Sequence, residues 1–301
     1  MLSQVDLQAS HKIAVAEVSP EDGELKTLNP KKEPRQRSKV TERGSDDTTF
    51  SIEASLATCV HGYLKPDRQT PASLIVLHFV IQSDDSSSIV KSARTSFFFK
   101  LPGEVDEKDS HATINVMAFA PGHRRFNKST SKKTKKRELE FEAGGEASPA
   151  KADGKYSEEN KEVHTQPYFE KMDAGRRYVD PHAIHDKVWW RVTQNKSHKL
   201  GITPEFRTAI LVTRKDASQF HGIFRLKIDG GVKYNLSEKY NDWRGKSVVD
   251  DPVIFDPSFN PHGVENCNIE IKSDSLGELI EDEYILRKDL LATWGCTDWD
   301  A

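Results

Sequence analysis

The stretch "ASLIVLHFVIQS", residues Ala72–Ser83, decides the fold class of this 301-residue chain. Between Ser73 and Gln82 both sets of alternating positions are apolar: Ile75, Leu77, Phe79 and Ile81 form one set, and Leu74, Val76 and Val80 form the other. Successive side chains of a strand point to opposite faces, so a strand that is apolar on both faces belongs in the middle of a sheet covered on both sides. We therefore predict a central strand here.

The sequence on both sides of this stretch carries further strand signals. Residues 48–122 and 187–272 alternate short runs of β-branched and aromatic residues with clusters of Pro, Gly, Asp and Ser. In "GIFRLKI", residues 222–228, one alternating set is wholly apolar, which is typical of a sheet with one buried face. The pattern predicts a mainly β protein, an antiparallel β-sandwich of about ten short strands, with these two segments as its parts.

Two segments have compositions that predict disorder. Residues 1–47 are mostly polar, so they cannot bury enough apolar surface to offset the entropy lost on ordering. Residues 123–186 begin with a run from Arg124 to Arg137 that holds eight basic residues and no acid. An acidic segment with the composition of a linker follows. We predict a mostly disordered N-terminal segment and a long, charged, largely disordered insertion.

The C-terminal residues 273–301 carry the one helical pattern in the chain. Leu279, Leu286 and Leu290 stand at i, i+7 and i+11, although Glu283 interrupts the apolar spacing at i+4. Acidic residues predominate early in this stretch, and that order suits a helix dipole. The spacing predicts an acidic C-terminal helix followed by a tail.

Composition and charge favour an intracellular protein. The net charge is −3, and the three cysteines, Cys59, Cys267 and Cys296, do not form a disulfide or zinc pattern. The first residues lack the basic and apolar regions of a signal peptide, and the longest apolar run is too short to span a bilayer. We expect a protein of the cytoplasm, or of the nucleus, that makes no membrane contact.

A basic run within the predicted insertion is of the type that mediates nuclear import. Its residues are Lys132, Lys133, Lys135, Lys136 and Arg137. Aromatic residues do not alternate with these cations, and acidic residues follow at once, so recognition of nucleic acid by base stacking is not expected. A solvated charged segment is the favoured interpretation, and an import signal is the alternative.

The stretch "HAIHD" places His182, His185 and Asp186 close together. Imidazoles and carboxylates bind zinc, and a spacing of i, i+3 on a helix would bring the two imidazoles together. Pro181 and the preceding "RRYVD" instead predict a turn, and no further ligand stands at a fixed spacing. A solvated loop is therefore favoured over a metal site.

The stretch "DDPVIFDPSFNP" contains the second group of candidate ligands, Asp250, Asp251 and Asp256. A proline follows Asp251 and another follows Asp256, which holds both aspartates in extended or turn conformations. Each carboxylate can accept a hydrogen bond from the backbone N–H two residues on, at Val253 and Ser258. In an extended chain Asp251 and Asp256 lie roughly 16 Å apart, too far to share a metal. We predict that these aspartates end a short strand, with metal binding or acid–base chemistry as the alternative.

Two further motifs contain reactive or aromatic side chains on predicted strands. Cys59 and His61 share one face of a strand, where contact is possible but a buried core cysteine is the commoner arrangement. Trp189 and Trp190 should point to opposite faces, so that one enters the core and the other covers an edge or the insertion.

The second half of the chain resembles a family of fungal intracellular proteins to which no activity is assigned. The resemblance rests on Val188–Asp229, "VWWRVTQN…GITPEFRTAILVTRK…FRLKID", followed by "DDPVIFDPSF". It extends over about residues 48–122 and 188–261, and departs from the family pattern at Gln194 and at Thr203-Pro204. The resemblance implies a fungal intracellular protein, and no catalytic residue or cofactor carries over from it.

These observations favour a non-enzymatic binding or scaffold protein. The sequence shows no GxSxG, phosphate-binding glycine loop or HExxH motif, so we predict no cofactor and no catalytic residue. Protein partners would bind through the charged insertion or a sheet edge. The alternative is a hydrolase or metal-dependent enzyme that uses the aspartates of 250–256 or the pair His182 and His185.

Overall fold

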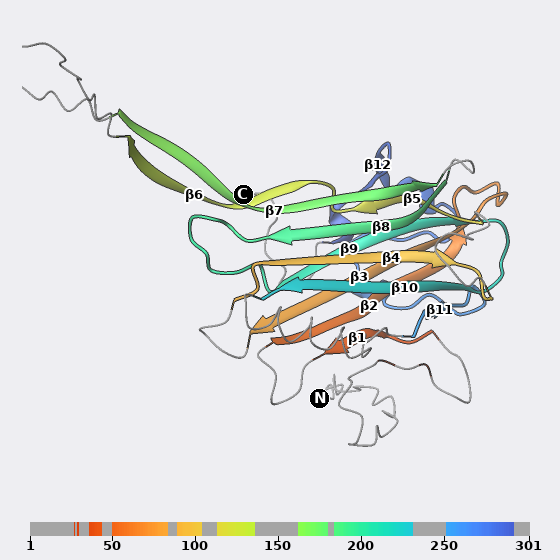
Figure 1. The fold of residues 1–301 in the computed structure, drawn as a ribbon. Helices are drawn as coiled ribbons and strands as arrows, with labels where there is room; N and C mark the ends of the chain where they lie inside the picture. The colour runs from red at the N-terminus through yellow and green to blue at the C-terminus, as the bar shows by residue number, and fades with distance from the viewer. Residues whose placement is uncertain are drawn as a thin grey trace, which may run out of the picture.

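The computed structural model describes residues 27, 29, 36–43, 50–83, 89–103, 113–135, 162–179, 184–230 and 251–291. Two sheets pack face to face as a sandwich-like fold, which confirms the predicted fold class (Figure 1). Sheet A has the order β1-β2-β3-β9-β5-β13-β12, and sheet B has the order β11-β10-β4-β8-β7-β6. Neighbouring strands are antiparallel throughout the described residues, apart from a parallel bridge between β5 and β13.

The strands of sheet A are β1 (Lys39–Arg43), β2 (Phe50–Tyr63), β3 (Pro71–Ser83), β5 (Ile114–Ala120), β9 (Glu205–Arg214), β12 (Ile280–Asp282) and β13 (Ile285–Leu286). Those of sheet B are β4 (Ser92–Lys100), β6 (Arg124–Lys135), β7 (Glu162–Val179), β8 (Ile184–Thr193), β10 (Phe220–Asp229) and β11 (Val253–Phe255). Three short 3-10 helices follow: η1 (Val264–Asn266), η2 (Leu276–Leu279) and η3 (Lys288–Leu290).

Strand β3 is central and covered on both faces, as the sequence predicts. It lies between β2 and β9, and its residues Ile75, Leu77, Phe79 and Ile81 enter the core between the sheets. Leu74 and Val76 point to the outer face of sheet A, into a second apolar cluster. The C-terminal segment covers that face with Leu276, Leu279, Leu286, Leu290 and Leu291. Burial of apolar area on both faces, at about 25 cal/mol per Å², is the main stabilising contribution at this strand.

The predicted C-terminal helix is wrong. Residues 276–290 form η2, the β12–β13 hairpin and η3 instead. The leucines that suggested a helix are buried as expected, but the hairpin turn at Glu283, whose φ is 33°, reverses the chain between them. The apolar spacing therefore identifies the leucines that pack against sheet A, but it does not determine the backbone conformation between them.

The prediction of disorder across residues 123–186 is wrong at both ends. β6 and β7 pair as a long hairpin, and the far half of this ribbon projects beyond the body of the sandwich (Figure 1). β7 joins the body because Met172 and Ala174 enter the core, while the charged Asp173 between them faces outward. The charges dominate the composition and hide this alternation. Residues 136–161 lie outside the described residues.

Order also reaches into the N-terminal segment. Strand β1, Lys39–Arg43, falls within residues 1–47, which were predicted to be mostly disordered, and it pairs with β2. Val40 is fully buried in the core, and the ladder with β2 holds the rest of the strand. Most residues before Gln36 lie outside the described part of the chain.

A buried carboxylate attaches the base of the β6–β7 ribbon to the sandwich. Glu170 is only 3% exposed and accepts hydrogen bonds from Thr203 N (2.6 Å), Thr203 Oγ1 (3.1 Å) and Asn127 Nδ2 (2.7 Å). A bulge in β6 between Phe126 and Ser129 brings Asn127 to this position. Burial raises the pKa of Glu170, and the three bonds act in the opposite direction.

Candidate ligand-binding pocket

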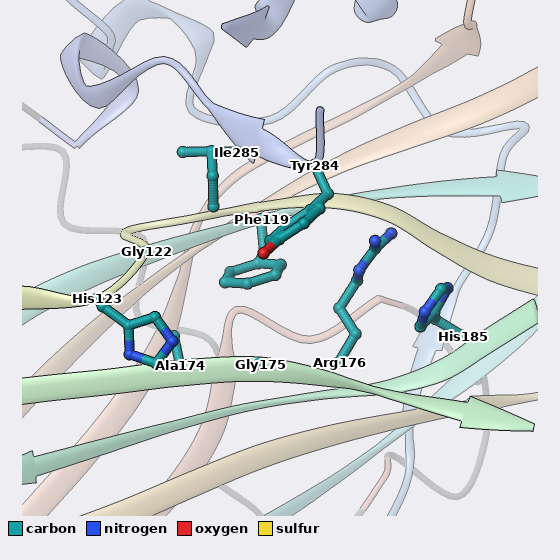
Figure 2. A pocket seen from close by; sticks show the side chains of 9 residues that line it. All are labelled: Phe119, Gly122, His123, Ala174, Gly175, Arg176, His185, Tyr284 and Ile285. Carbon is teal, nitrogen blue, oxygen red and sulfur yellow. The ribbon is translucent and has the colours of Figure 1, made fainter. Parts of the chain in front are cut away.

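A cavity of about 270 Å³ opens where β5, β7, β8 and the β12–β13 hairpin meet (Figure 2). Its walls combine aromatic, small and basic side chains: Phe119, Gly122, His123, Ala174, Gly175, Arg176, His185, Tyr284 and Ile285. The small residues leave room for a ligand, and the aromatic and basic side chains determine which chemical groups can bind there. Clefts with apolar walls and a few convergent polar groups are the usual form of small-ligand sites.

The apolar wall is a pair of stacked rings. The rings of Phe119 and Tyr284 lie 5.7 Å apart at an interplanar angle of 24°. Figure 2 shows the two rings facing each other at the edge of the cavity. The Phe119 N–H donates to the carbonyl of Tyr284 (2.9 Å), which holds the hairpin turn against β5. Behind them, the buried Trp190 ring packs edge-on against Phe119 and its Nε1 donates to the Pro121 carbonyl (3.0 Å). The wall is therefore fixed by packing and by hydrogen bonds before any ligand binds.

Arg176 supplies the positive charge of the pocket. Its Nη1 donates to the carbonyls of Val116 (2.9 Å) and Met117 (2.8 Å), and its Cζ lies 4.5 Å from the centre of the Tyr284 ring. The β5 ladder is irregular between Val116 and Ala118, and a bulge leaves carbonyls free to accept from a side chain. The guanidinium is thus held over the Tyr284 ring of the aromatic wall.

Two histidines flank the guanidinium. The backbone N–H of His185 donates to Asn115 Oδ1 (2.8 Å), and its ring packs edge-on against the exposed Tyr178 at 5.6 Å. Burial, and then the charge of Arg176, lowers the pKa of His185, so this imidazole is neutral at pH 7. On the other side, His123 Nδ1 lies 3.5 Å from Asp173 Oδ1. Burial lowers the pKa of Arg176 as well, yet arginine stays charged at neutral pH.

The solvated loop predicted at "HAIHD" is wrong for its last residues, because His185 and Asp186 belong to strand β8. His185 lines the pocket, whereas Asp186 is fully buried and bound by Arg177, through Nε to Oδ1 (2.9 Å) and Nη2 to Oδ2 (2.5 Å). His182 lies outside the described residues. Within the described ranges, no group of three His, Cys, Asp or Glu side chains is placed to hold a metal ion.

Asp251 and Asp256 flank strand β11, which lies at an edge of sheet B. Asp256 Oδ1 accepts from Ser258 N (2.9 Å), which confirms the predicted turn, and its Oδ2 accepts from Gln219 Nε2 (2.5 Å). Asp251 Oδ2 accepts from Asn29 N (3.0 Å), and the bond from Val253 N to Asp251 stays a prediction. Asp250 lies outside the described residues. Burial acts to raise the pKa of Asp256, and the bonds from Ser258 and Gln219 outweigh it and lower that pKa.

Cys59 and His61 are in contact inside the sandwich. Cys59 Sγ lies 3.5 Å from His61 Nε2, and His61 Nδ1 lies 2.8 Å from Ser73 Oγ. Burial raises the pKa of the Cys59 thiol to about 12 and lowers the pKa of His61 to about 4. Both groups are neutral at pH 7, so the thiol is not activated as a nucleophile. The interpretation of Cys59 as a buried core residue is confirmed, since it is 1% exposed.

The two tryptophans point to opposite faces of β8, as predicted. Trp190 is buried in the core, and Trp189 faces outward, where the Arg94 guanidinium lies 5.1 Å from its ring centre.

In the basic run, Lys132, Lys133 and Lys135 lie on β6 opposite Thr165, His164 and Glu162 of β7. Lys136 and Arg137 fall outside the described residues, and the role of the run in nuclear import stays a prediction.

Sequence reasoning singled out His185 but missed the other residues that form the pocket. Phe119 lay in a stretch predicted as strand, Arg176 in the predicted insertion, and Tyr284 in the predicted helix. Neither the residue type nor the spacing distinguishes any of these three positions from the rest of its segment. The pocket exists because three segments distant in sequence meet at β5, and no local spacing signals such a meeting.

Comparison with known proteins assigns no family. No family model and no curated protein matches the chain, so the resemblance to fungal proteins stays a prediction. Among solved structures, the chain is similar to the crystal structure of the Clostridium perfringens NetB toxin in its membrane-inserted form. The two share 12% identity over 64% of this chain and 82% of that chain, with a TM-score of 0.27, which supports no argument about fold or function. None of the helices described in the structure is long and apolar enough to cross a membrane.

Proposed function

We propose that this chain is a non-enzymatic binding protein, whose pocket between β5, β7 and the β12–β13 hairpin takes an anionic group attached to a planar apolar body. The observation that carries the proposal is the Arg176 guanidinium held 4.5 Å from the Tyr284 ring centre at the edge of the cavity. A guanidinium pairs with carboxylates and phosphates, and the rings of Phe119 and Tyr284 offer a flat surface for an apolar ring.

The size of the pocket narrows the class of ligand. Drug-sized ligands occupy pockets of roughly 300–1,000 Å³, and this cavity of about 270 Å³ lies just below that range. An aromatic ring with one short acidic substituent suits that space. A free aryl acid and an aromatic side chain beside the terminal carboxylate of a peptide share this chemistry.

The enzyme alternative receives less support from the arrangement of the candidate groups. Catalysis or metal binding requires several such groups to converge in one pocket. Strand β11, which carries Asp251 and Asp256 at its ends, is separated from β8, which carries His185, by β10 and β4. Three strand spacings correspond to roughly 14 Å. This separation favours binding over joint chemistry.

Phenylacetate should bind the full chain, and Arg176→Gln should weaken that binding about tenfold or more. The reason is that hydrogen bonds to a charged group contribute about 1.5–3 kcal/mol. Isothermal titration calorimetry measures the affinity, with phenyl phosphate as the second anion and phenylacetamide as the neutral analogue. Stronger binding of phenyl phosphate would identify phosphate as the preferred anion.

The matched control is Arg68→Gln, the same change at an exposed position in the turn after β2. It should leave the affinity for phenylacetate unchanged. Equal affinity for phenylacetate and phenylacetamide, or unaltered binding in Arg176→Gln, would contradict the proposal. Thermal melting of both variants verifies that they are folded.

A further inference from the structure

The outer face of sheet B brings three cations into direct cross-strand register. Lys227 on β10 is opposite Arg94 on β4, and Arg94 is opposite Arg191 on β8. All three side chains are exposed. They point away from the core, because their neighbours along the strands lie in the cluster between the sheets: Ala93, Val192 and Ile228.

This row is unfavourable in the isolated protein. Neighbouring strands lie about 4.8 Å apart, and like charges directly opposite one another destabilise a sheet. One acidic residue, Asp173, continues the row on β7 opposite Arg191, but its carboxylate lies 3.5 Å from His123. Lys171, exposed two residues before Asp173, adds a further cation at this end of the face. The chain as a whole carries a net charge of −3, so this row of cations does not reflect an overall excess of positive charge.

The neighbouring row of side chains, around Trp189, argues against a single-stranded nucleic acid as the partner. Trp189 lies between Ser96 and Gly175, and the Arg94 guanidinium covers its ring at 5.1 Å. A Cβ at Gly175 would lie 3.0 Å from the Trp189 ring, so the ring rests directly on the β7 backbone. Single-stranded nucleic acids bind by stacking bases on accessible aromatic faces, and this ring is covered by Arg94 and packed against β7.

We infer that the outer face of sheet B binds an acidic segment of a partner protein, with its carboxylates opposite Lys227, Arg94 and Arg191. Arginine forms paired hydrogen bonds with carboxylates, and a row of cations on adjacent strands matches a run of acidic side chains. Asp173 at the end of the row would repel a continuous phosphate backbone, whereas it can pair with a basic residue of a protein. This site is distinct from the Arg176 pocket, since Arg176 and Tyr284 lie on the side of β7 that faces β5.

Fluorescence anisotropy with a labelled oligo-glutamate peptide tests this inference on the full chain. The double variant Arg94→Glu/Arg191→Glu should weaken binding by about tenfold or more at low ionic strength. The milder variant Arg94→Gln/Arg191→Gln should weaken it in the same direction, so that a folding defect in the first variant does not decide the result. The control Lys65→Glu/Lys215→Glu makes the same change in net charge at two exposed turn positions, and should change the affinity less than about twofold.

Three results would overturn the inference. The first is an equal loss of affinity in the control and in the Arg94/Arg191 variants, which would mean that only total charge matters. The second is no detectable binding of oligo-glutamate by the unmodified protein. The third is tighter binding of a labelled single-stranded RNA than of oligo-glutamate, with the same dependence on Arg94 and Arg191, which would assign the face to nucleic acid.

Discussion

Arg177→Met should lower the free energy of unfolding by about 3–5 kcal/mol. The carboxylate of Asp186 is fully buried, and Arg177 binds both of its oxygens, at 2.9 and 2.5 Å. Removing the guanidinium leaves a buried charge without its ion-pair partner, which costs far more than the loss of an exposed ion pair. Urea denaturation followed by circular dichroism measures the change.

A double variant separates the effect of the unpaired buried charge from the effect of lost side-chain packing. In Arg177→Met/Asp186→Asn the buried charge is gone, so much of the lost stability should return. Arg191→Met, which shortens an exposed arginine on the neighbouring strand β8, should change stability by less than about 0.5 kcal/mol. If Arg177→Met proves as mild as Arg191→Met, the ion pair between Arg177 and the buried Asp186 does not stabilise the junction of β7 and β8.

Acidification from pH 7 to pH 4 should remove about 3 kcal/mol of stability through His61 alone. Burial, and then the charge of Arg214, lowers the pKa of His61 from 6.5 to about 4 in the folded protein, while Asp256 acts in the opposite direction. Below pH 6.5 the unfolded chain takes up a proton at this histidine that the folded chain does not. Stability therefore falls as the pH drops through this window, and one pKa unit corresponds to about 1.4 kcal/mol.

His61→Gln isolates this contribution from other groups that titrate in the same range. Glutamine has a polar head that can hydrogen-bond with Ser73 Oγ, which lies 2.8 Å from His61 Nδ1, and it does not titrate. The stability difference between the parent and His61→Gln should shrink or reverse as the pH falls from 7 to 4. A constant difference across this range would show that His61 keeps its ordinary pKa in the folded protein.

The sequence was informative wherever local spacing determines the structure. The two apolar faces of Ser73–Gln82 predicted a strand covered on both sides, and β3 lies in that position. The Asp-Pro pair at Asp256 predicted the turn that ends β11, because that hydrogen bond forms within three residues.

The sequence failed where tertiary contacts override local composition. The β6–β7 ribbon was missed, because its charged residues outnumber Phe126, Met172 and Ala174, which enter the core. The β12–β13 hairpin was missed, because Leu279 and Leu286 have helical spacing although the chain reverses between them. The pocket was missed for the same reason, since its wall depends on that hairpin lying against β5.

The proposal that this chain binds an aryl anion through Arg176 depends most on where the ligand ring lies. Intermolecular nuclear Overhauser effects between bound phenylacetate and the protein measure this directly. We predict contacts from the ligand ring protons to the side chains of Phe119, Tyr284 and Ile285, which line the cavity. Bound phenylacetate whose contacts fall on other residues, with none to these three, would contradict the proposal.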